Sequence, residues 1–336
     1  MAWSIAIAGM TADPAPDAGG ELFVPAATGS ALPDPGVLPA SPVTRFAPAP
    51  TGHLHLGHLV NAIYVWGIAR ATGGRVILRI EDHDRQRSRA TFERAILEDL
   101  ARLGLVPDEP PLRAFAADAT GYRQSDVPDR YAAALRRLES VGLVYACACS
   151  RSTYAAWEAE NGRPWRGIGC PGDCRYLGLD HASGDAGLRV AVGAGSERWV
   201  DLLVGPVADE PGAGGDPLVR DRLGNLTYAL CVVVDDAHHG VDLVIRGRDL
   251  LEATPVQLRL ARLLGRETPP RFLHHPLVRR ISGQKLSKAS GDTAVRSMLD
   301  AGATAAELFG RAARLAGLRP DDSPIEAARL GELFGG

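Results

Sequence analysis

The chain has 336 residues, of which 46% are hydrophobic and 23% are charged. This composition predicts one large or two ordinary folded domains and excludes global disorder. The formal net charge is −3, so no basic tail indicates a nucleic-acid partner, and no apolar run approaches the ~20 residues that a membrane span needs. The start of the chain lacks the basic region of a secretory signal, and we therefore expect a cytoplasmic protein with no membrane partner.

The first 43 residues differ in composition from the rest of the chain. They contain seven prolines and four acidic residues, but no Lys or Arg. Such a segment has too little patterned apolar surface to offset the entropy of ordering. We therefore predict that residues 1–43 form a mobile extension.

Strands and helices alternate in the predicted elements on both sides of an irregular middle. Before the middle we expect a strand over 43–50, a helix over 59–72, a strand over 73–82, and amphipathic helices over 88–105 and 126–143. The middle, 146–225, is rich in Gly and Pro and is expected to contain only short strands. After it we expect strands over 227–236 and 241–247, a helix over 248–265 and a strand over 271–278.

This order predicts an α/β fold, in which a parallel sheet carries an inserted subdomain. The predicted division is 1–43 for the extension, 44–145 and 226–292 for the two halves of a catalytic domain, 146–225 for the insertion, and 293–336 for C-terminal helices. Ligands of parallel sheets bind beyond the carboxyl ends of the strands. The loops that follow the predicted strands are therefore where we expect functional residues.

The strongest local motif is the stretch 50–58, PTGHLHLGH, between the first strand and the first helix. Gly57 allows close approach to the backbone, and the helix start offers free N–H groups to an anion. His55 and His58 are three residues apart and can both face a phosphate whose charge grows in a transition state. Alternatively, the two histidines merely cap the helix; a metal pair is also conceivable, although no further ligand has zinc-type spacing.

A second motif is carried by lysine. Of the 37 basic residues, 35 are Arg, and the only two Lys, Lys285 and Lys288, lie three residues apart in the stretch 281–292. Lysine offers a compact charge on a flexible stem, whereas arginine offers a planar fork. Chance placement on a solvated loop is the alternative, but the grouping amid Gly and Ser favours a functional loop.

The two motifs together resemble the signatures of class I aminoacyl-tRNA synthetases, with HLGH at 55–58 and KLSK at 285–288. The stretches 45–58, 79–87, 227–236 and 244–257 further resemble the glutamate-specific branch of that family, in the expected order. The resemblance implies a Rossmann-like catalytic fold. It also implies activation of L-glutamate by ATP with Mg²⁺, without a covalent enzyme nucleophile.

The resemblance assigns roles to individual residues. It implies that His55 and His58 stabilise charge on the phosphates while Lys288, helped by Lys285, follows the departing pyrophosphate. The ATP-binding residues are then His55, Gly57, His58 and Lys288. The implied glutamate pocket comprises Arg45, Phe46, Ala47, Pro48, Ala49, Glu81, Tyr228 and Arg246.

Within this pocket, Arg45 and Arg246 are expected to bind the side-chain carboxylate, Glu81 the ammonium group, and Tyr228 to supply a hydroxyl donor. Surface ion pairs and an ordinary core tyrosine are the alternatives. The sequence departs from the family at Ala229, where a polar residue is common, and at Ala47-Pro48-Ala49, where one Ser is usual.

The stretch after the second motif is short, with 48 residues beyond Lys288. The resemblance then points to a short form of the glutamate-specific branch that lacks an anticodon-binding domain, activates glutamate without tRNA and transfers it to queuosine in the anticodon of tRNA(Asp). We expect a monomer. The alternatives are a truncated enzyme that charges a tRNA 3′ end, a nucleotidyltransferase with the same fold, and a catalytically silent RNA-binding module.

Four of the five cysteines lie within 28 residues, as Cys147-x-Cys149 and Cys170-x-x-x-Cys174. Two closely spaced pairs joined by a loop can form a tetrahedral thiolate site for Zn²⁺. Disulfides are disfavoured in a cytosolic chain, and clustering disfavours four unrelated thiols. In the resembled family the third ligand is often Tyr, and here Cys170 takes that place. We therefore expect one structural zinc per chain, and we expect Cys231 to be a core residue.

Overall fold

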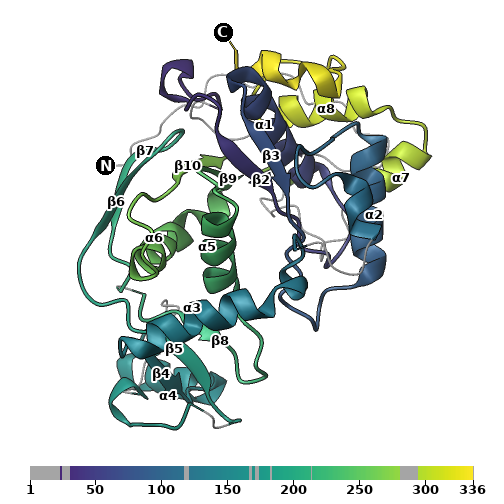
Figure 1. The fold of residues 1–336 in the computed structure, drawn as a ribbon. Helices are drawn as coiled ribbons and strands as arrows, with labels where there is room; N and C mark the ends of the chain where they lie inside the picture. The colour runs from purple at the N-terminus through teal and green to yellow at the C-terminus, as the bar shows by residue number, and fades with distance from the viewer. Residues whose placement is uncertain are drawn as a thin grey trace, which may run out of the picture.

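The computed structural model describes residues 23–24, 31–116, 121–165, 169–170, 174–181, 184–212, 214–280 and 294–335. Its central layer is a parallel sheet, as the sequence predicts (Figure 1). Strand β2 (Val43–Phe46) pairs in parallel with β3 (Arg75–Leu78). Strand β9 (Leu243–Gly247) pairs in parallel with β10 (Arg271–His275).

The two strand pairs are neighbours, because the backbone N–H of Asp242 donates to the carbonyl of Val43 at 3.0 Å. Beyond β10 the sheet continues with β6 (Glu197–Asp201), which is parallel to β10, and with β7 (Gly205–Asp209), which is antiparallel to β6. Both strands that extend the sheet therefore come from the middle region predicted as an insertion.

Side chains alternate between the two faces of the sheet, as the pleat requires. Leu243, Ile245 and Leu273 belong to the larger core, whereas Val244 and Phe272 belong to a smaller cluster on the opposite face. Both faces are thus apolar, which is typical of a parallel sheet covered by helices on each side.

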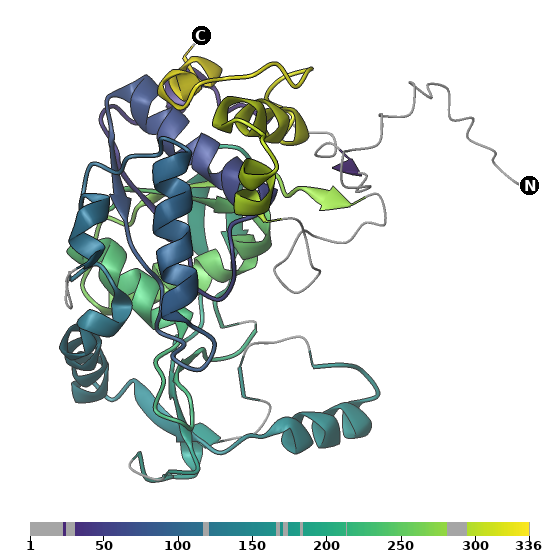
Figure 2. The same cartoon turned by 90° about the vertical axis from the view of Figure 1, so that its right-hand side faces the viewer.

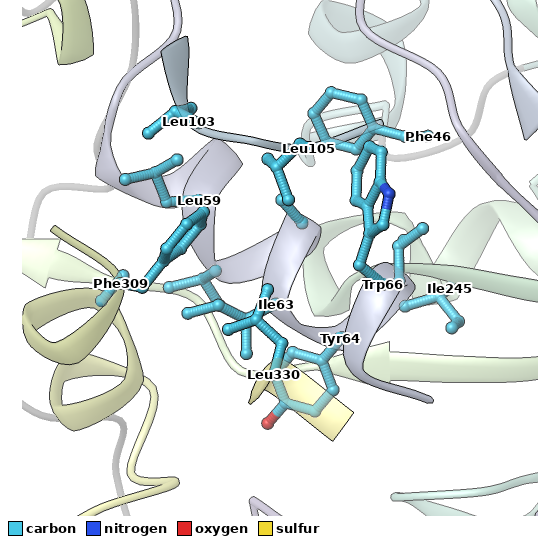
Figure 3. Packing of buried hydrophobic residues seen from close by; sticks show 14 of the residues in the cluster. Phe46, Leu59, Ile63, Tyr64, Trp66, Leu103, Leu105, Ile245, Phe309 and Leu330 are labelled. Carbon is cyan, nitrogen blue, oxygen red and sulfur yellow. The ribbon is translucent and has the colours of Figure 1, made fainter. Parts of the chain in front are cut away.

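Helix α1 (Leu56–Thr72) forms the centre of the larger core (Figure 3). It is packed by α2 (Ala90–Arg102) and by the C-terminal segments α7 (Val295–Asp300), α8 (Ala305–Leu315) and the 3₁₀ helix η7 (Ala327–Leu333). A Cβ at Gly67 would lie 2.4 Å from the Phe334 ring, so glycine allows η7 to lie directly on α1. The expected C-terminal helices therefore complete the larger core.

The opposite face is covered by α6 (Thr254–Leu263), with α5 (Tyr228–His238) and α3 (Pro128–Ser140) next to it (Figure 1). Helix α5 corrects our prediction of a strand over 227–236. It is buried on several sides and carries three consecutive valines, so it shows no helical polar–apolar period. Cys231 is a core residue as expected, but it lies in this helix.

The rest of the middle region forms a separate lobe, called the outer lobe here, at the end of the molecule opposite α8 (Figures 1 and 2). Strands β4 (Val144–Cys147), β5 (Gly187–Val190) and β8 (Leu218–Arg220) make a small antiparallel sheet there. The lobe also contains α4 (Arg151–Asn161), which we did not predict. The sequence signal for α4 is a capping box, in which the Ser150 side chain accepts from the N–H of Thr153 and the Thr153 hydroxyl accepts from the N–H of Ser150.

The last part of the segment 1–43, which we predicted to be mobile, is packed on the domain. The prediction of a mobile extension is therefore wrong for residues from Ala31 onward. Leu38 and Ala31 pack against the larger core, and the Tyr64 hydroxyl donates to the carbonyl of Ala31. Apolar residues of this segment thus cover the α1 face. Residues 1–22 and 25–30 lie outside the described ranges.

The remaining elements are short. They are β1 (Phe23–Val24), which pairs antiparallel with β11 (Arg279–Arg280), and the 3₁₀ turns η1 (Pro35–Val37), η2 (Leu112–Ala116), η3 (Gln124–Asp126), η4 (Cys174–Tyr176) and η5 (Arg248–Ala253). Among the described helices, none has the length and apolar character needed to cross a membrane.

Candidate active site and metal centre

A cavity of about 510 Å³ opens at the carboxyl ends of β2 and β9, beside the start of α1. All the residues predicted to bind glutamate line it, together with three residues of the HLGH motif: Arg45, Phe46, Ala47, Pro48, Ala49, Glu81, Tyr228, Arg246, His55, Gly57 and His58. The fold thus brings segments 200 residues apart to one cavity. Lys285 and Lys288 lie outside the described residues.

The two histidines cap α1 with the same ring nitrogen. His55 Nδ1 accepts from the N–H of Gly57 at 3.1 Å, and His58 Nδ1 accepts from the N–H of His55 at 3.1 Å. A neutral imidazole that accepts through Nδ1 carries its proton on Nε2. Capping and anion binding are therefore compatible, because the capping bond orients Nε2–H as a donor.

Gly57 fits closely against the ring of His55. A Cβ at this position would lie 3.0 Å from Cε1 and 3.1 Å from Nδ1 of His55, closer than most side chains approach. A larger residue would therefore displace the ring that caps the helix.

Arg45 and Arg79 share a buried carboxylate behind the cavity. Arg79 Nη1 donates to Asp236 Oδ1 at 2.7 Å, and Arg45 Nε donates to the same oxygen at 3.2 Å. Burial alone would raise the pKa of Asp236, but the two guanidinium groups lower it below its ordinary value. Asp236 comes from α5, the helix that we predicted to be a strand.

Glu81 is held by the same arginine. Arg79 Nη2 donates to Glu81 Oε1 at 2.9 Å, and Glu81 itself lines the cavity. Arg79 is 1% exposed and does not line the cavity, so it acts as the anchor between Glu81 and Asp236. We predicted no role for Arg79 or Asp236, although both lie in stretches that carry the family resemblance, 79–87 and 227–236.

Arg246 differs from these two arginines in the groups that it contacts. Its nitrogen atoms donate to His274 Nε2 at 2.9 Å, Gln257 Oε1 at 2.6 Å, Thr254 Oγ1 at 2.8 Å and Tyr228 Oη at 3.4 Å. Among the described residues, no carboxylate lies within ion-pair distance of it. It is 4% exposed, and burial lowers its pKa. A buried cation without a counterion is a strong site for an anionic ligand.

Asn61 and His275 also line the cavity, and we did not predict them. Asn61 Nδ2 lies 3.1 Å from His275 Nε2, while His275 Nδ1 donates to the carbonyl of Pro276 at 2.9 Å. Asn61 lies three residues after the first motif, and His275 lies within the last predicted strand. These positions in the sequence were the available signal for a place in the cavity.

The four clustered cysteines meet in the outer lobe. Their sulfur atoms all lie within 4.8 Å of one another, and the Cys149 sulfur is 3.0 Å from that of Cys170 and 3.6 Å from that of Cys174. A tetrahedral zinc site with Zn–S bonds of about 2.3 Å places its sulfur atoms about 3.8 Å apart. The residues therefore fit a four-thiolate metal site.

Arg189 on β5 supports this cluster. Burial alone would raise the pKa of Cys147, but the N–H of Cys149 and the Arg189 guanidinium donate to its sulfur and lower that pKa. Burial and the neighbouring sulfur atoms raise the pKa of Cys170. An adjacent cation favours the thiolate form that binds metal ions.

Comparison with known proteins identifies the family to which a chain with this site belongs. The sequence model of the family described as tRNA synthetases class I (E and Q), catalytic domain, matches residues 42–322. A protein of Symbiobacterium thermophilum named glutamyl-Q tRNA(Asp) synthetase is 40% identical over 86% of this chain and 91% of its own length. A protein of that name from Pseudomonas fluorescens is 42% identical over 74% of this chain and 77% of its own length.

A glutamate–tRNA ligase 2 of Acidiphilium cryptum is 38% identical, and the match covers 86% of this chain but 64% of that relative. The solved structure of a glutamate tRNA ligase from Elizabethkingia meningosepticum superposes with a TM-score of 0.72 at 24% identity, covering 88% of this chain and 64% of that one. The structural likeness establishes the fold, and the sequence relatives establish the branch. The chain belongs to the class I tRNA synthetase family, in the branch of the glutamyl-Q tRNA(Asp) synthetases.

Proposed function

We propose that this protein activates L-glutamate with ATP in the absence of tRNA and transfers the glutamyl group to queuosine in the anticodon of tRNA(Asp). The observation that carries the proposal is the 40% identity to a glutamyl-Q tRNA(Asp) synthetase over 91% of that relative. The cavity supports it independently, because it combines an acidic residue, a helix start and a buried cation that has no counterion among the residues that the structure describes.

In the proposed complex, the glutamate side-chain carboxylate binds Arg246, with Arg45 beside it, since Arg246 has only neutral partners among the described residues. The ammonium group binds Glu81, and the Tyr228 hydroxyl lies at the wall between them. Residues 46–49 line the same cavity, and the small side chains of Ala47 and Ala49 leave room for the substrate.

The reaction joins an oxygen of the glutamate α-carboxylate to the α-phosphorus of ATP, and pyrophosphate leaves. His55 and His58 donate through Nε2 to the phosphate oxygens, and Gly57 keeps the helix start accessible. Lys288, helped by Lys285, follows the pyrophosphate as it departs. Mg²⁺ accompanies the ATP phosphates, as is general for this ion. Catalysis then consists of positioning and charge stabilisation.

Cys147, Cys149, Cys170 and Cys174 would hold one Zn²⁺. Four protein ligands leave no open position, so the ion would act as a crosslink in the outer lobe. We propose that this lobe contacts the tRNA. A monomer in the cytoplasm stays a prediction of the sequence.

The test is amino-acid-dependent exchange between ATP and pyrophosphate, run with all amino acids and with and without tRNA. We expect exchange with glutamate alone and no requirement for tRNA. Activation of another amino acid, or strict dependence on tRNA, would refute the proposal.

The alternative, charging of a tRNA 3′ end, is separated by analysing the product. Labelled glutamate is transferred to tRNA, which is then cut with nucleases. Label in the anticodon loop of tRNA(Asp) supports our proposal, whereas label on the terminal adenosine supports the alternative.

A further inference from the structure

A buried aspartate–histidine pair lies directly behind the pocket arginine. His274 on β10 is fully buried and does not line the cavity, but its Nε2 accepts from Arg246 Nε at 2.9 Å. Its other ring nitrogen, Nδ1, lies 2.6 Å from Asp201 Oδ2. Neither Asp201 nor His274 belongs to the motifs of this chain.

Asp201 is fixed as an acceptor by the backbone. Its Oδ1 accepts from the N–H groups of Leu203 and Val204, each at 3.0 Å. Since ionised carboxylates only accept, His274 must donate through Nδ1, and its Nε2 then presents a lone pair to Arg246. The aspartate therefore selects the tautomer of the histidine, and the tautomer provides the acceptor that orients the guanidinium.

The pair thus holds Arg246 without neutralising it. The other two partners within 3 Å, Gln257 and Thr254, are also neutral, and the Asp201 carboxylate stays on the far side of the imidazole ring. Arg45, by contrast, donates directly to a carboxylate. We infer that Asp201 and His274 are positioning residues that keep the charge of Arg246 directed at the substrate carboxylate and thereby set the preference for glutamate over glutamine.

This inference rests on the proposed function and has a physical reason in the substrate. Glutamate and glutamine have the same length and differ at one terminal group, so shape cannot separate them well. Charge can, because a guanidinium and a carboxylate attract each other as two full charges at close range, whereas a neutral amide offers the guanidinium only a dipole. If His274 took the other tautomer, two N–H groups would face each other and Arg246 would move.

The experiment measures exchange without tRNA for glutamate and for glutamine in Asp201→Asn. An asparagine can donate to His274 and so permit the wrong tautomer. We expect KM for glutamate to rise by about 10-fold or more, kcat to change by less than about 3-fold, and kcat/KM for glutamine to stay within about 3-fold. Equal losses for both amino acids, or no change, would overturn the inference.

The matched control is Asp216→Asn, which removes a carboxylate that also accepts a backbone N–H, from Val192 at 2.9 Å, but lies in the outer lobe. It should leave the glutamate-to-glutamine ratio unchanged. If Asp201→Asn does not fold, the same exchange measurement with the two variants His274→Gln and His274→Leu tests the inference. The Gln side chain can accept from Arg246 and donate to Asp201, so only the Leu variant should lose discrimination; equal behaviour would overturn the inference.

Failure of this inference is distinguishable from failure of the proposed function. Wild-type protein without glutamate-dependent exchange would refute the function. If the wild-type protein shows glutamate-dependent exchange and Asp201→Asn has the same KM and kcat as the wild type, only the role of Asp201 and His274 is refuted.

Discussion

His55 and His58 show how one residue type serves both structure and chemistry. Each ring closes a capping bond through Nδ1, and the same bond sets the tautomer that makes Nε2 a donor. The sequence left capping and phosphate binding as alternatives. The geometry makes them compatible, since a cap that fixes the ring also removes the entropy cost of orienting it for a ligand.

Gly57→Ala tests this coupling. The added Cβ would lie 3.0 Å from the His55 ring, so the ring must shift while the helix itself gains a better helix former. We expect the rate of adenylate formation to fall about 10-fold or more with the melting temperature nearly unchanged. Rapid-quench measurement of adenylate decides it. Gly184→Ala, where the added Cβ meets open space, is the control and should keep the wild-type rate.

The two lysines give a sequence-based prediction. If Lys288 meets the phosphates as pyrophosphate departs, Lys288→Ala should lower kcat for activation by ~100-fold, the scale of losing one donor to transition-state charge. Lys288→Arg should recover only part, because its rigid fork cannot follow a moving phosphate as a flexible ammonium does. Lys285→Ala should cost less.

Pre-steady-state adenylate formation is again the measurement. Glutamate binding should be nearly unaffected, because the residues proposed to bind it lie elsewhere. A wild-type rate in Lys288→Ala would mean that the stretch 281–292 is only a solvated loop.

At the scale of elements, α5 carries the largest difference between expectation and structure. Three consecutive valines favour a strand, but the segment is a buried helix that packs against α3 and α6. The helical turn places Asp235 and Asp236 side by side at its buried end, where they meet Arg79, Arg130 and Arg45. A strand would have directed the two carboxylates to opposite faces.

The outer lobe gives a prediction about metal content. We expect one zinc per chain by elemental analysis and a lower melting temperature after treatment with a chelator, because metal binding stabilises only the folded lobe. Cys170→Ser should lose the zinc while changing glutamate-dependent exchange by less than about 3-fold, since the cavity lies in the other lobe. Cys231→Ser, at a buried cysteine of α5, should keep the full zinc content. Intact, zinc-free wild-type protein would contradict the assignment.

At the scale of the whole molecule, buried histidines make stability depend on pH. Burial lowers the pKa of His275 to about 4, against about 6.5 in an unfolded chain. Between these values the unfolded state binds a proton that the folded state does not, so the free energy of unfolding falls as the pH decreases. His239 acts in the same direction, with burial again lowering its pKa to about 4.

Denaturant unfolding at pH 7.5 and pH 5 measures this effect. We expect His275 to contribute a loss on the order of 2 kcal/mol at the lower pH, and His275→Gln should remove that part of the dependence. His181→Gln, at a solvent-accessible position, is the control. An unchanged pH dependence in His275→Gln would show that another group is responsible.

The sequence by itself determined the parallel α/β fold, the branch of the family, the histidine and cysteine motifs, and part of the set of residues that line the cavity. These features are local: a motif is read within ten residues, and a strand that ends in a charged residue points to the ligand edge of a parallel sheet. The four cysteines were found for the same reason, since their spacing alone limits what they can form.

Only the tertiary structure decided how these residues are supported. Arg79, Asp236, Asp201 and His274 look like ordinary polar residues in the sequence, and their partners lie as far as 191 residues away. The same holds for the charges of the two pocket arginines, because Arg45 meets a carboxylate from α5, whereas the partners of Arg246 in the described part of the chain are neutral. Such differences arise from packing between distant segments, which no local pattern of residues encodes.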